Sequence, residues 1–379
     1  MKIRIAMDSF KGSLTSTEAG NAVAAGFGKI FPEADIRVYP MADGGEGTVQ
    51  ALAALGGTVR TVKVRDPLCR PIEAQYLLLS DGTAVMEMAA AAGLPLLEPQ
   101  ERNPLVTTTF GVGEMIADAL RGGCTKFLLG IGGSATNDGG AGMLTALGWR
   151  LADAQGNPIV NGAQGLLSLC SIDEKDVLPL VRNAQFTVAC DVTNPLCGAR
   201  GASAVFAPQK GAKPAEIPVL DGALARFAQV AKTVYPDADK EAAGAGAAGG
   251  LGFGLKTFLN ADLRSGVESV MRLTGLTEAL ADADLVIVGE GRMDAQTVMG
   301  KAPAGVAKLA KQYGAAVIGI AGSIAPDADA CHACIDAYFP ILQKPCTLEE
   351  ALTVAAAREN LTKTAEEIAR LWRTAKKIV

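Results

Sequence analysis

The amino-acid sequence predicts an α/β protein with a flavodoxin-like or Rossmann-like parallel-sheet domain built from both chain ends and a second α/β domain inserted between them. Three observations support this prediction. The chain of 379 residues is longer than the roughly 250 to 300 residues at which single cores stop growing. Apolar runs alternate with helical patterns near both termini, which is typical of a parallel sheet covered by helices. Between them, short β-rich segments joined by turns interrupt this alternation.

The first 62 residues predict a βαβ unit followed by a helix. Residues 3–7 and 36–41 are short apolar runs of strand length. Thr15 and Glu18 have the spacing of a capping box, which predicts a helix between the two strands. A further helix is expected from about residue 47 to 55, where two glycines follow that can end it.

The remaining elements predict the two domains. In the middle of the chain we expect strands at 59–64, 72–79 and 84–88, a helix at 109–120, and buried strands at 126–131 and 186–190. Near the C-terminus we expect strands at 285–289, 315–320 and 335–339, a helix at 303–313, and one long helix from Leu348. We therefore place one domain at residues 1–62 and 285–379 and the inserted domain at 63–284, with the active site in the cleft between them.

Composition excludes several classes of protein. Hydrophobic residues make up 49% of the chain and charged residues 20%, which argues against disorder. A net charge of −5 and scattered cations argue against a nucleic-acid partner. The longest apolar stretch, residues 84–97, is interrupted by Glu87 and Pro95, so we expect no membrane span and no signal peptide. A small molecule is the expected partner, and a homodimer is compatible with the sequence.

The eight cysteines are too few and too irregularly spaced for a disulfide framework, which indicates a cytoplasmic protein. Cys331, His332 and Cys334 form the one suggestive metal-binding cluster. Only Cys346 follows it, so we expect no bound zinc. His332 is the single histidine and lies far from the other motifs, so any proton acceptor should be a carboxylate.

Acidic residues follow four predicted strands: Asp8, Asp43, Asp191 and Glu290. Ligands of open α/β sheets bind at the carboxyl ends of the strands, so these groups could converge on one crevice. Such a group of carboxylates suits Mg²⁺, with Asp43, Asp191 and Glu290 as the candidate ligands. In the alternative interpretation, each residue only caps a helix or a turn.

A glycine-rich segment at residues 130–142 lies between a predicted strand and an apolar helix. Glycine N–H groups, nearby hydroxyls and the following helix N-terminus favour a bound polyphosphate, so we expect ATP here. The candidate phosphate-binding residues are Gly132, Gly133, Ser134, Thr136 and Asn137, with Lys210 as a cation. The alternative is a tight turn capped by Asp138. Another glycine run, residues 244–249, matches a dinucleotide-binding string but does not follow a strand.

The remaining candidates are groups for an acidic substrate and for proton transfer. Ser9, Lys11 and Arg292 flank strand-end acids and are the candidate substrate-binding residues. Asp191, Asp294 and Lys11 are the candidate catalytic residues, because a kinase uses a carboxylate to accept the hydroxyl proton and relies on positioning and charge neutralisation. Which carboxylate is the base and which binds metal stays open at this point.

Seven strings resemble those of the type I glycerate kinases and occur in the family's order along the whole chain. They are Asp8-Ser-Phe-Lys-Gly-Ser-Leu14, Ala42-Asp-Gly-Gly-Glu-Gly-Thr48, Gly130-Ile-Gly-Gly-Ser-Ala-Thr-Asn-Asp-Gly-Gly140, Cys190-Asp-Val-Thr-Asn-Pro-Leu196, Pro208-Gln-Lys-Gly-Ala212, Gly244–Gly250 and Gly289-Glu-Gly-Arg-Met-Asp-Ala-Gln-Thr297. The resemblance implies transfer of the ATP γ-phosphoryl group to D-glycerate, giving 2-phosphoglycerate, and a two-domain fold with a flavodoxin-like part. One departure is Met7, where family members often have proline before Asp8.

Two other functions compete with the kinase. Gly130, Gly132 and Ala135 follow a strand, and Asp153 lies about 20 residues on, as in an NAD-dependent dehydrogenase of hydroxy acids. Asp138 argues against it, because its charge would repel a pyrophosphate that brings no metal. A non-catalytic sensor of sugar acids would leave the many strand-end carboxylates unexplained. The residues themselves do not distinguish O2 from O3 of glycerate as the acceptor.

Overall fold

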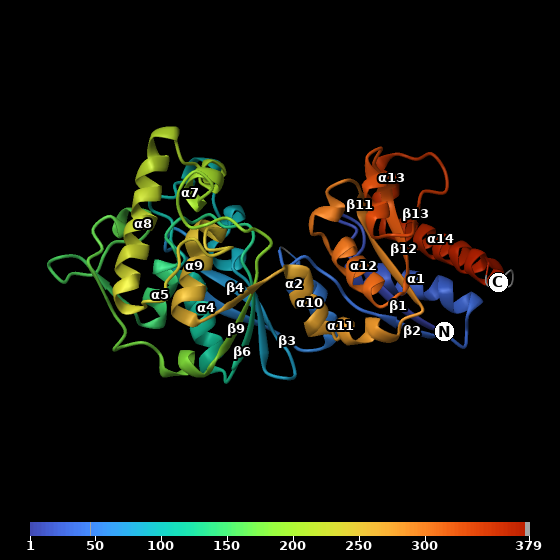
Figure 1. Cartoon of the computed structure of the whole chain (residues 1–379), viewed down its shortest axis with the longest axis horizontal. Coiled ribbons are helices and arrows are strands. Elements are labelled where there is room, and N and C mark those ends of the chain that lie inside the picture. Colours follow the sequence, from blue (N-terminus) through green and yellow to red (C-terminus); the bar gives the residue numbers. More distant parts are fainter. Residues whose placement is uncertain (46, 376–379) are drawn as a thin grey trace. The chain divides into compact units, whose positions relative to one another are not determined.

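The computed structural model describes residues 1–45 and 47–375, and the chain divides into two compact units (Figure 1). Unit 1 comprises Met1–Asp43, Gln50–Leu55 and the chain from Val267 onward, and unit 2 comprises Gly44–Val49 and Gly56–Gly266. Glu46, part of the 42–48 string, lies outside the described residues.

These bounds differ from the predicted ones at both junctions. A boundary after residue 62 would fall inside β3 (Thr58–Arg65), which pairs along its whole length with β4 (Pro71–Leu78) in the sheet of unit 2. The second junction lies at Gly266 instead of residue 284, so nearly all of α10 (Gly266–Thr274) and all of α11 (Leu276–Ala279) belong to unit 1.

Unit 1 contains a five-stranded sheet in the order β2-β1-β11-β12-β13, with every neighbouring pair parallel. In sequence order within this unit, the arrangement is 2-1-3-4-5, the strand order of flavodoxin-like folds. Its strands are β1 (Lys2–Met7), β2 (Asp35–Val38), β11 (Leu285–Met293), β12 (Ala316–Ile324) and β13 (Ala337–Pro340). The predicted flavodoxin-like domain, built from both chain ends, is confirmed.

Helices pack on this sheet through alternating apolar positions. Ile3 and Ile5 of β1 share a buried core with Phe27 of α1 (Ser16–Ile30) and with Leu361 and Ile368 of α14 (Val354–Ala375). The predicted capping box is present: the backbone N–H of Glu18 donates to Oγ1 of Thr15 at 3.2 Å, and that of Thr15 donates to the Glu18 carboxylate. The other helices are α2 (Thr48–Leu52), α12 (Ala302–Gln312) and α13 (Leu348–Leu352).

The C-terminal helix differs from the prediction. We expected one continuous helix from Leu348, but the structure has α13 and α14, separated at Thr353. The backbone of Thr353 is extended, with φ −62° and ψ 134°, so the helical hydrogen-bond pattern is interrupted there. This break allows α13 to follow a direction of its own.

Unit 2 contains a six-stranded mixed sheet in the order β10-β9-β6-β5-β4-β3. The β3-β4 and β4-β5 pairs are antiparallel, and the other pairs are parallel. Its remaining strands are β5 (Thr83–Glu87), β6 (Lys126–Gly130), β9 (Gln185–Ala189), β10 (Asp262–Arg264) and a separate pair, β7 (Arg150–Ala152) and β8 (Ser171–Asp173). The helices are α3 (Ala89–Ala92), α4 (Phe110–Arg121), α5 (Ala141–Leu147), α6 (Ala163–Leu166), α7 (Ala202–Phe206), α8 (Ile217–Val234) and α9 (Ala247–Leu259).

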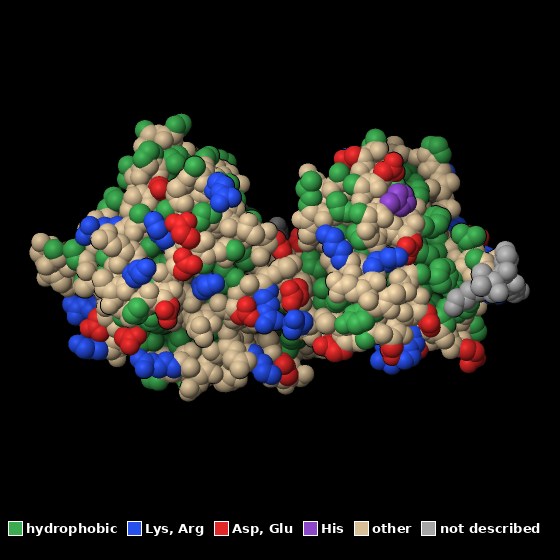
Figure 2. Space-filling view, in the orientation of Figure 1, with side chains coloured by type: hydrophobic (Ala, Val, Ile, Leu, Met, Phe, Trp, Pro, Cys, Tyr) green, Lys and Arg blue, Asp and Glu red, His purple; other side chains and the backbone are tan. Residues whose placement is uncertain are grey.

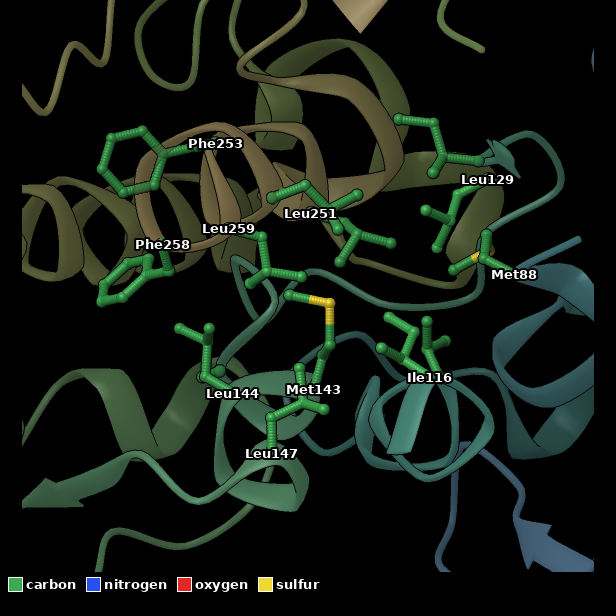
Figure 3. Packing of buried hydrophobic residues seen from close by; sticks show 14 of the residues in the cluster. Met88, Ile116, Leu129, Met143, Leu144, Leu147, Leu251, Phe253, Phe258 and Leu259 are labelled. Atoms are coloured by element: carbon green, nitrogen blue, oxygen red, sulfur yellow. The ribbon is translucent and has the colours of Figure 1, made fainter. Parts of the chain in front are cut away.

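The core of unit 2 joins these helices to the sheet. Met143 and Leu144 of α5 lie close to Leu251 and Leu259 of α9 within one buried apolar cluster (Figure 3). This packing fixes the segment between β6 and α5, which carries the glycine-rich loop. No helix in the described part of the chain is long and apolar enough to cross a membrane.

Candidate active site

A cavity of about 500 Å³ opens in unit 1 at the carboxyl ends of β1 and β11. These two strands flank the point at which the strand order of the sheet reverses, the usual ligand-binding position in open α/β sheets. Six of the predicted site residues line it: Ser9, Lys11, Asp43, Glu290, Arg292 and Asp294. The strand-end pattern in the sequence therefore identified most of the polar side of this cavity.

Asp8 lies directly after β1 and is mostly buried at the cavity wall. Its Oδ1 accepts a hydrogen bond from the backbone N–H of Ser9 at 2.6 Å. Burial raises the pKa of Asp8 to about 6, against the effect of that hydrogen bond, and the nearby carboxylates of Asp43 and Glu290 add to the rise. Negative charge is thus concentrated at this end of the cavity.

Glu290 lies within β11 and is only 7% exposed. Its Oε1 accepts a hydrogen bond from the Thr297 hydroxyl at 2.6 Å, and its Oε2 accepts one from Nζ of Lys301 at 3.2 Å. Burial raises the pKa of Glu290, and these two donors partly oppose the rise. Both oxygens are held in place by side chains of the same unit.

Asp294 follows β11 in a turn with cations on both sides. Its Oδ1 accepts a hydrogen bond from the backbone N–H of Gln296 at 2.9 Å and lies 3.6 Å from Nζ of Lys301. Nε of Arg292 lies 3.9 Å from the other carboxylate oxygen, while 69% of the Arg292 side chain stays exposed. Because β11 continues to Met293 rather than ending at residue 289, it carries Arg292 along the cavity edge.

Unit 2 holds the other predicted residues. Gly132 and Gly133 are exposed at the turn after β6, and Gly133 has φ +74°, which glycine adopts without strain. Ser134, Thr136 and Asn137 follow them and are buried. Their side chains therefore face the protein interior, and only the glycine backbone is open to an anion.

Lys210 is also buried, with 1% of its surface exposed. Its Nζ donates hydrogen bonds to Oγ of Ser134 at 3.2 Å and to the carbonyl oxygen of Thr136 at 2.7 Å. Burial lowers the pKa of Lys210 to about 7, with the charge of Asp138 opposing the shift. The ammonium group thus contacts the loop from its inner side.

Asp138 fixes the end of the loop. One oxygen, Oδ2, accepts hydrogen bonds from the backbone N–H and the hydroxyl of Thr109 at 2.8 and 2.9 Å. The carboxylate also accepts from the N–H groups of Gly140 and Gly142 at 3.1 and 3.2 Å. Asp138 thereby joins the starts of α4 and α5, a structural role that the alternative interpretation of this segment had assigned to it.

The glycine run at residues 244–250 packs against this loop. The backbone N–H of Gly139 donates to the carbonyl oxygen of Gly249 at 3.0 Å. A Cβ atom at Gly249 would lie 1.9 Å from the carbonyl oxygen of Thr136, so only glycine fits this contact. The run therefore supports the backbone of the glycine-rich loop.

Asp191 follows β9 in unit 2 and is exposed. Its Oδ1 accepts a hydrogen bond from the backbone N–H of Gly266 at 3.0 Å. Within the described residues, no three acidic, histidine or cysteine side chains are grouped closely enough to hold a metal ion by themselves. Carboxylates alone therefore form no complete metal cage in this part of the chain.

The model of the glycerate kinase family matches residues 3–373. The chain belongs to the glycerate kinase family. The glycerate kinase of Bacillus subtilis is 50% identical over 99% of each chain, and the glycerate 2-kinase of Escherichia coli K12 is 48% identical over 97% of each chain. A crystal structure of the candidate glycerate kinase 2 of Salmonella typhimurium LT2 superimposes with a TM-score of 0.91 at 48% identity, covering 100% of this chain and 99% of that one.

As a member of the glycerate kinase family, the protein is a kinase, and the dehydrogenase alternative is wrong. A dinucleotide fold would place the strand before Asp153 parallel and adjacent to β6. The structure instead pairs that strand, β7, antiparallel with β8, while β6 lies between β5 and β9. Oδ1 of Asp153 accepts hydrogen bonds from the N–H groups of Gln155 and Asn157, so it closes a local turn.

Sequence reasoning missed the apolar side of the unit 1 cavity. Its main contributors are Ile341, Leu342, Leu348, Ala351 and Leu352, which lie on and before α13. Thr347 and Glu350 form a capping box that could have indicated a helix start there. Nothing in the sequence indicates that this helix faces the end of β1, because that contact joins residues far apart in the chain.

On the face shown in Figure 2, Lys and Arg side chains are interspersed with Asp and Glu, and no broad basic area is visible. His332 is exposed and stacks on Tyr338, with ring centroids 4.8 Å apart, and does not line the cavity.

Proposed function

We propose that this protein transfers the γ-phosphoryl group of ATP to D-glycerate and that the product is 2-phosphoglycerate. The observation that carries the proposal is the unit 1 cavity, where hydroxyl, cationic and carboxylate groups meet at the strand-order reversal. Family membership supports glycerate as the acceptor, and the printed name of the Escherichia coli relative supports its 2-hydroxyl. Cytoplasmic location remains a prediction from the sequence.

Ser9, Lys11 and Arg292 are proposed to bind glycerate. Lys11 and Arg292 are exposed cations at the cavity, and a carboxylate substrate would be attracted to both. The Ser9 hydroxyl adds a polar group beside them. These contacts would hold the acid so that one hydroxyl faces the phosphoryl group, which is how a kinase obtains most of its rate.

Proton transfer is assigned to a carboxylate. The acceptor oxygen of glycerate forms a bond to the γ-phosphorus, its proton passes to the base, and the bond to the bridging oxygen breaks with its electron pair leaving on ADP. Asp191 and Asp294 are the two candidate bases. Asp294 lines the cavity with Arg292, whereas Asp191 lies in unit 2, so variants of each are needed to distinguish them.

Mg²⁺ is proposed as the metal, held by one or two of the candidate ligands Asp43, Asp191 and Glu290. Kinase sites hold Mg²⁺ through one or two carboxylates together with substrate phosphates, so an incomplete protein cage is consistent with it. The fit rests on Asp8, whose pKa is raised mainly by burial and further by the nearby carboxylates of Asp43 and Glu290. When bound, the ion neutralises phosphate charge in the transition state.

The glycine turn of unit 2 is proposed to bind a phosphate group of ATP. Exposed Gly132 and Gly133 leave their backbone accessible to an anion. Ser134, Thr136, Asn137 and Lys210 complete the predicted phosphate-binding set, and their burial supports a role in holding the turn. Lys210 would then act through the loop conformation.

A coupled assay with purified protein, ATP, Mg²⁺ and D-glycerate tests the proposal, with ³¹P and ¹³C NMR identifying the product. We expect ATP consumption only when Mg²⁺ and D-glycerate are both present, and a phosphate on O2. Absence of glycerate-dependent ATP consumption would overturn the proposed activity, and phosphate on O3 would overturn the assigned position.

A further inference from the structure

The unit 1 cavity has two chemically different halves. Its polar half is formed by the turn after β1 and by the end of β11, with the charged residues described above. Its apolar half is formed by Phe10, Ile341, Leu342, Leu348, Ala351, Leu352 and Ala357. The proposed contacts to glycerate use only the polar half, so the apolar half has no assigned ligand.

The size of the cavity indicates a larger ligand than glycerate. A volume of about 500 Å³ lies in the range of pockets that hold cofactors and drug-sized molecules. Glycerate is a three-carbon acid with a polar group on every carbon. It can neither fill this volume nor gain from contact with aliphatic side chains.

Three leucines at the apolar half are unusually exposed. Leu342 is 43% exposed, Leu348 is 74% exposed and Leu352 is 38% exposed, although all three line the same cavity. Adjacent exposed apolar side chains that line a concave site mark ligand contacts more often than isolated ones do. A flat apolar group bound here would cover them.

The position of α13 relates this apolar wall to the polar half. A Cβ atom at Gly12 would lie 3.9 Å from Cδ1 of Leu352, so α13 lies next to the turn after β1. The Ser13 hydroxyl in this turn is buried and has no hydrogen-bond partner among the described residues. The turn thus combines an aliphatic neighbour with an unused polar group.

We propose that the apolar half of this cavity binds the nucleoside of ATP, with the adenine base against Leu342, Leu348 and Leu352. The inference rests on the proposed kinase function, since ATP is its donor substrate. It assigns nucleoside recognition to unit 1, and in particular to α13. The three exposed leucines offer the apolar contact that a flat base can use and that glycerate cannot.

The test uses Leu348→Asn and Leu352→Asn, which replace leucine by an uncharged polar side chain of similar size. Val354→Asn is the matched control, because Val354 is 46% exposed, begins α14 as Leu348 begins α13, and does not line the cavity. In the full-length enzyme we expect each leucine variant to raise the KM for ATP about tenfold. The KM for D-glycerate should change less than twofold, and the control should match wild type.

Calorimetric titration separates the base from the phosphates without relying on activity. ADP and inorganic tripolyphosphate serve as the two probes. We expect both leucine variants to bind ADP about tenfold more weakly and tripolyphosphate as tightly as wild type. Unchanged ADP affinity in both variants, or equal weakening of both probes, would overturn the nucleoside assignment even if the wild-type enzyme phosphorylates glycerate. Failure of the wild type to phosphorylate glycerate would instead overturn the proposed function.

Discussion

Nζ of Lys301 lies 3.2 Å from Oε2 of Glu290, joining the residue before α12 to the end of β11. The carboxylate is 9% exposed and the ammonium group belongs to a side chain that is 33% exposed. The pair therefore lies at the edge of the cavity, where one partner is buried and the other reaches solvent. Removal of the lysine would leave the Glu290 carboxyl with the Thr297 hydroxyl as its nearest stabilising donor.

We predict that Lys301→Met moves the acid limb of kcat/KM for ATP to higher pH by about one unit. Burial already raises the pKa of Glu290, and the loss of the cation raises it further, so the ionised form is lost at a higher pH. A pH series of kcat/KM measures the shift. Lys311→Met is the control, because Lys311 pairs with Asp336 away from the cavity. An acid limb at the wild-type position would show that Glu290 need not be ionised for turnover.

The exposed glycine turn of unit 2 permits a test without backbone strain. Gly133 has φ +74°, so any other residue there would strain the backbone, and a change in ATP binding could not be attributed to the lost phosphate contact. Gly132 has no such restriction, and a Cβ atom there would meet only Cα of Gly45 at 3.6 Å. Alanine at residue 132 is therefore tolerated by the fold.

We predict that Gly132→Ala raises the KM for ATP about tenfold, because the methyl group occupies space that a phosphate oxygen needs next to the backbone. Steady-state kinetics at saturating glycerate provide the measurement. Gly28→Ala is the control, since Gly28 lies in α1 with open space around its Cα. If both variants show the wild-type KM, this turn does not bind ATP.

Asp191 is predicted to act through its charge. Asp191→Asn keeps an oxygen that can accept the hydrogen bond from Gly266, so its melting temperature should stay near that of wild type. The loss of a base or a metal ligand should lower kcat by about 10² to 10⁴-fold. Recovery at high Mg²⁺ would identify a ligand, and no recovery would favour the base.

Near-normal kcat in this variant would mean that Asp191 only holds the backbone of Gly266. In that case Asp294→Asn becomes the decisive variant, because Asp294 is the other candidate base and lines the unit 1 cavity. A loss of kcat in Asp294→Asn alone would then assign proton transfer to unit 1.

The parts of the cavity and the loops that were predictable from sequence are those that depend on the pattern of residues within a short segment. Asp8 and Glu290 follow from the rule that ligands bind at carboxyl ends of parallel strands, since each strand was visible as an apolar run. The glycine-rich loop was predictable as a turn because several glycines follow an apolar run of strand length. The flavodoxin-like domain followed from the alternation of strands and helices near both chain ends.

The parts that were not predictable depend on contacts between distant segments. Leu352 adjoins Gly12 through tertiary packing, and no local pattern indicates it. The break at Thr353 occurs without glycine or proline, so helix propensity did not reveal it. Lys210 was predicted as a cation of the phosphate-binding set, and its burial was not predicted. Its ammonium group contacts Ser134 and Thr136, which are distant from it in the sequence.

Lys210 provides a test of how the glycine-rich loop is held. Its ammonium group donates hydrogen bonds to Ser134 and Thr136, and only 1% of the residue's surface is exposed. Burial lowers the pKa of Lys210 to about 7, whereas an unfolded lysine titrates near 10.4. Between these two values the unfolded chain binds more protons than the folded chain, so folding stability rises with pH across this window.

We predict that Lys210→Met removes this rise. The free energy of unfolding of wild type, relative to that of Lys210→Met, should increase from about pH 7 to about pH 10 by up to a few kcal/mol, since methionine has no proton to lose. Urea denaturation at several pH values measures the difference, and Lys213→Met controls for an exposed lysine on the same segment. The variant should also raise the KM for ATP, because Ser134 and Thr136 lose the donor that fixes the loop. If the free energies of unfolding of wild type and Lys210→Met change in parallel with pH, Lys210 stays charged throughout this range. If the variant has the wild-type KM for ATP, the loop keeps its shape without the lysine.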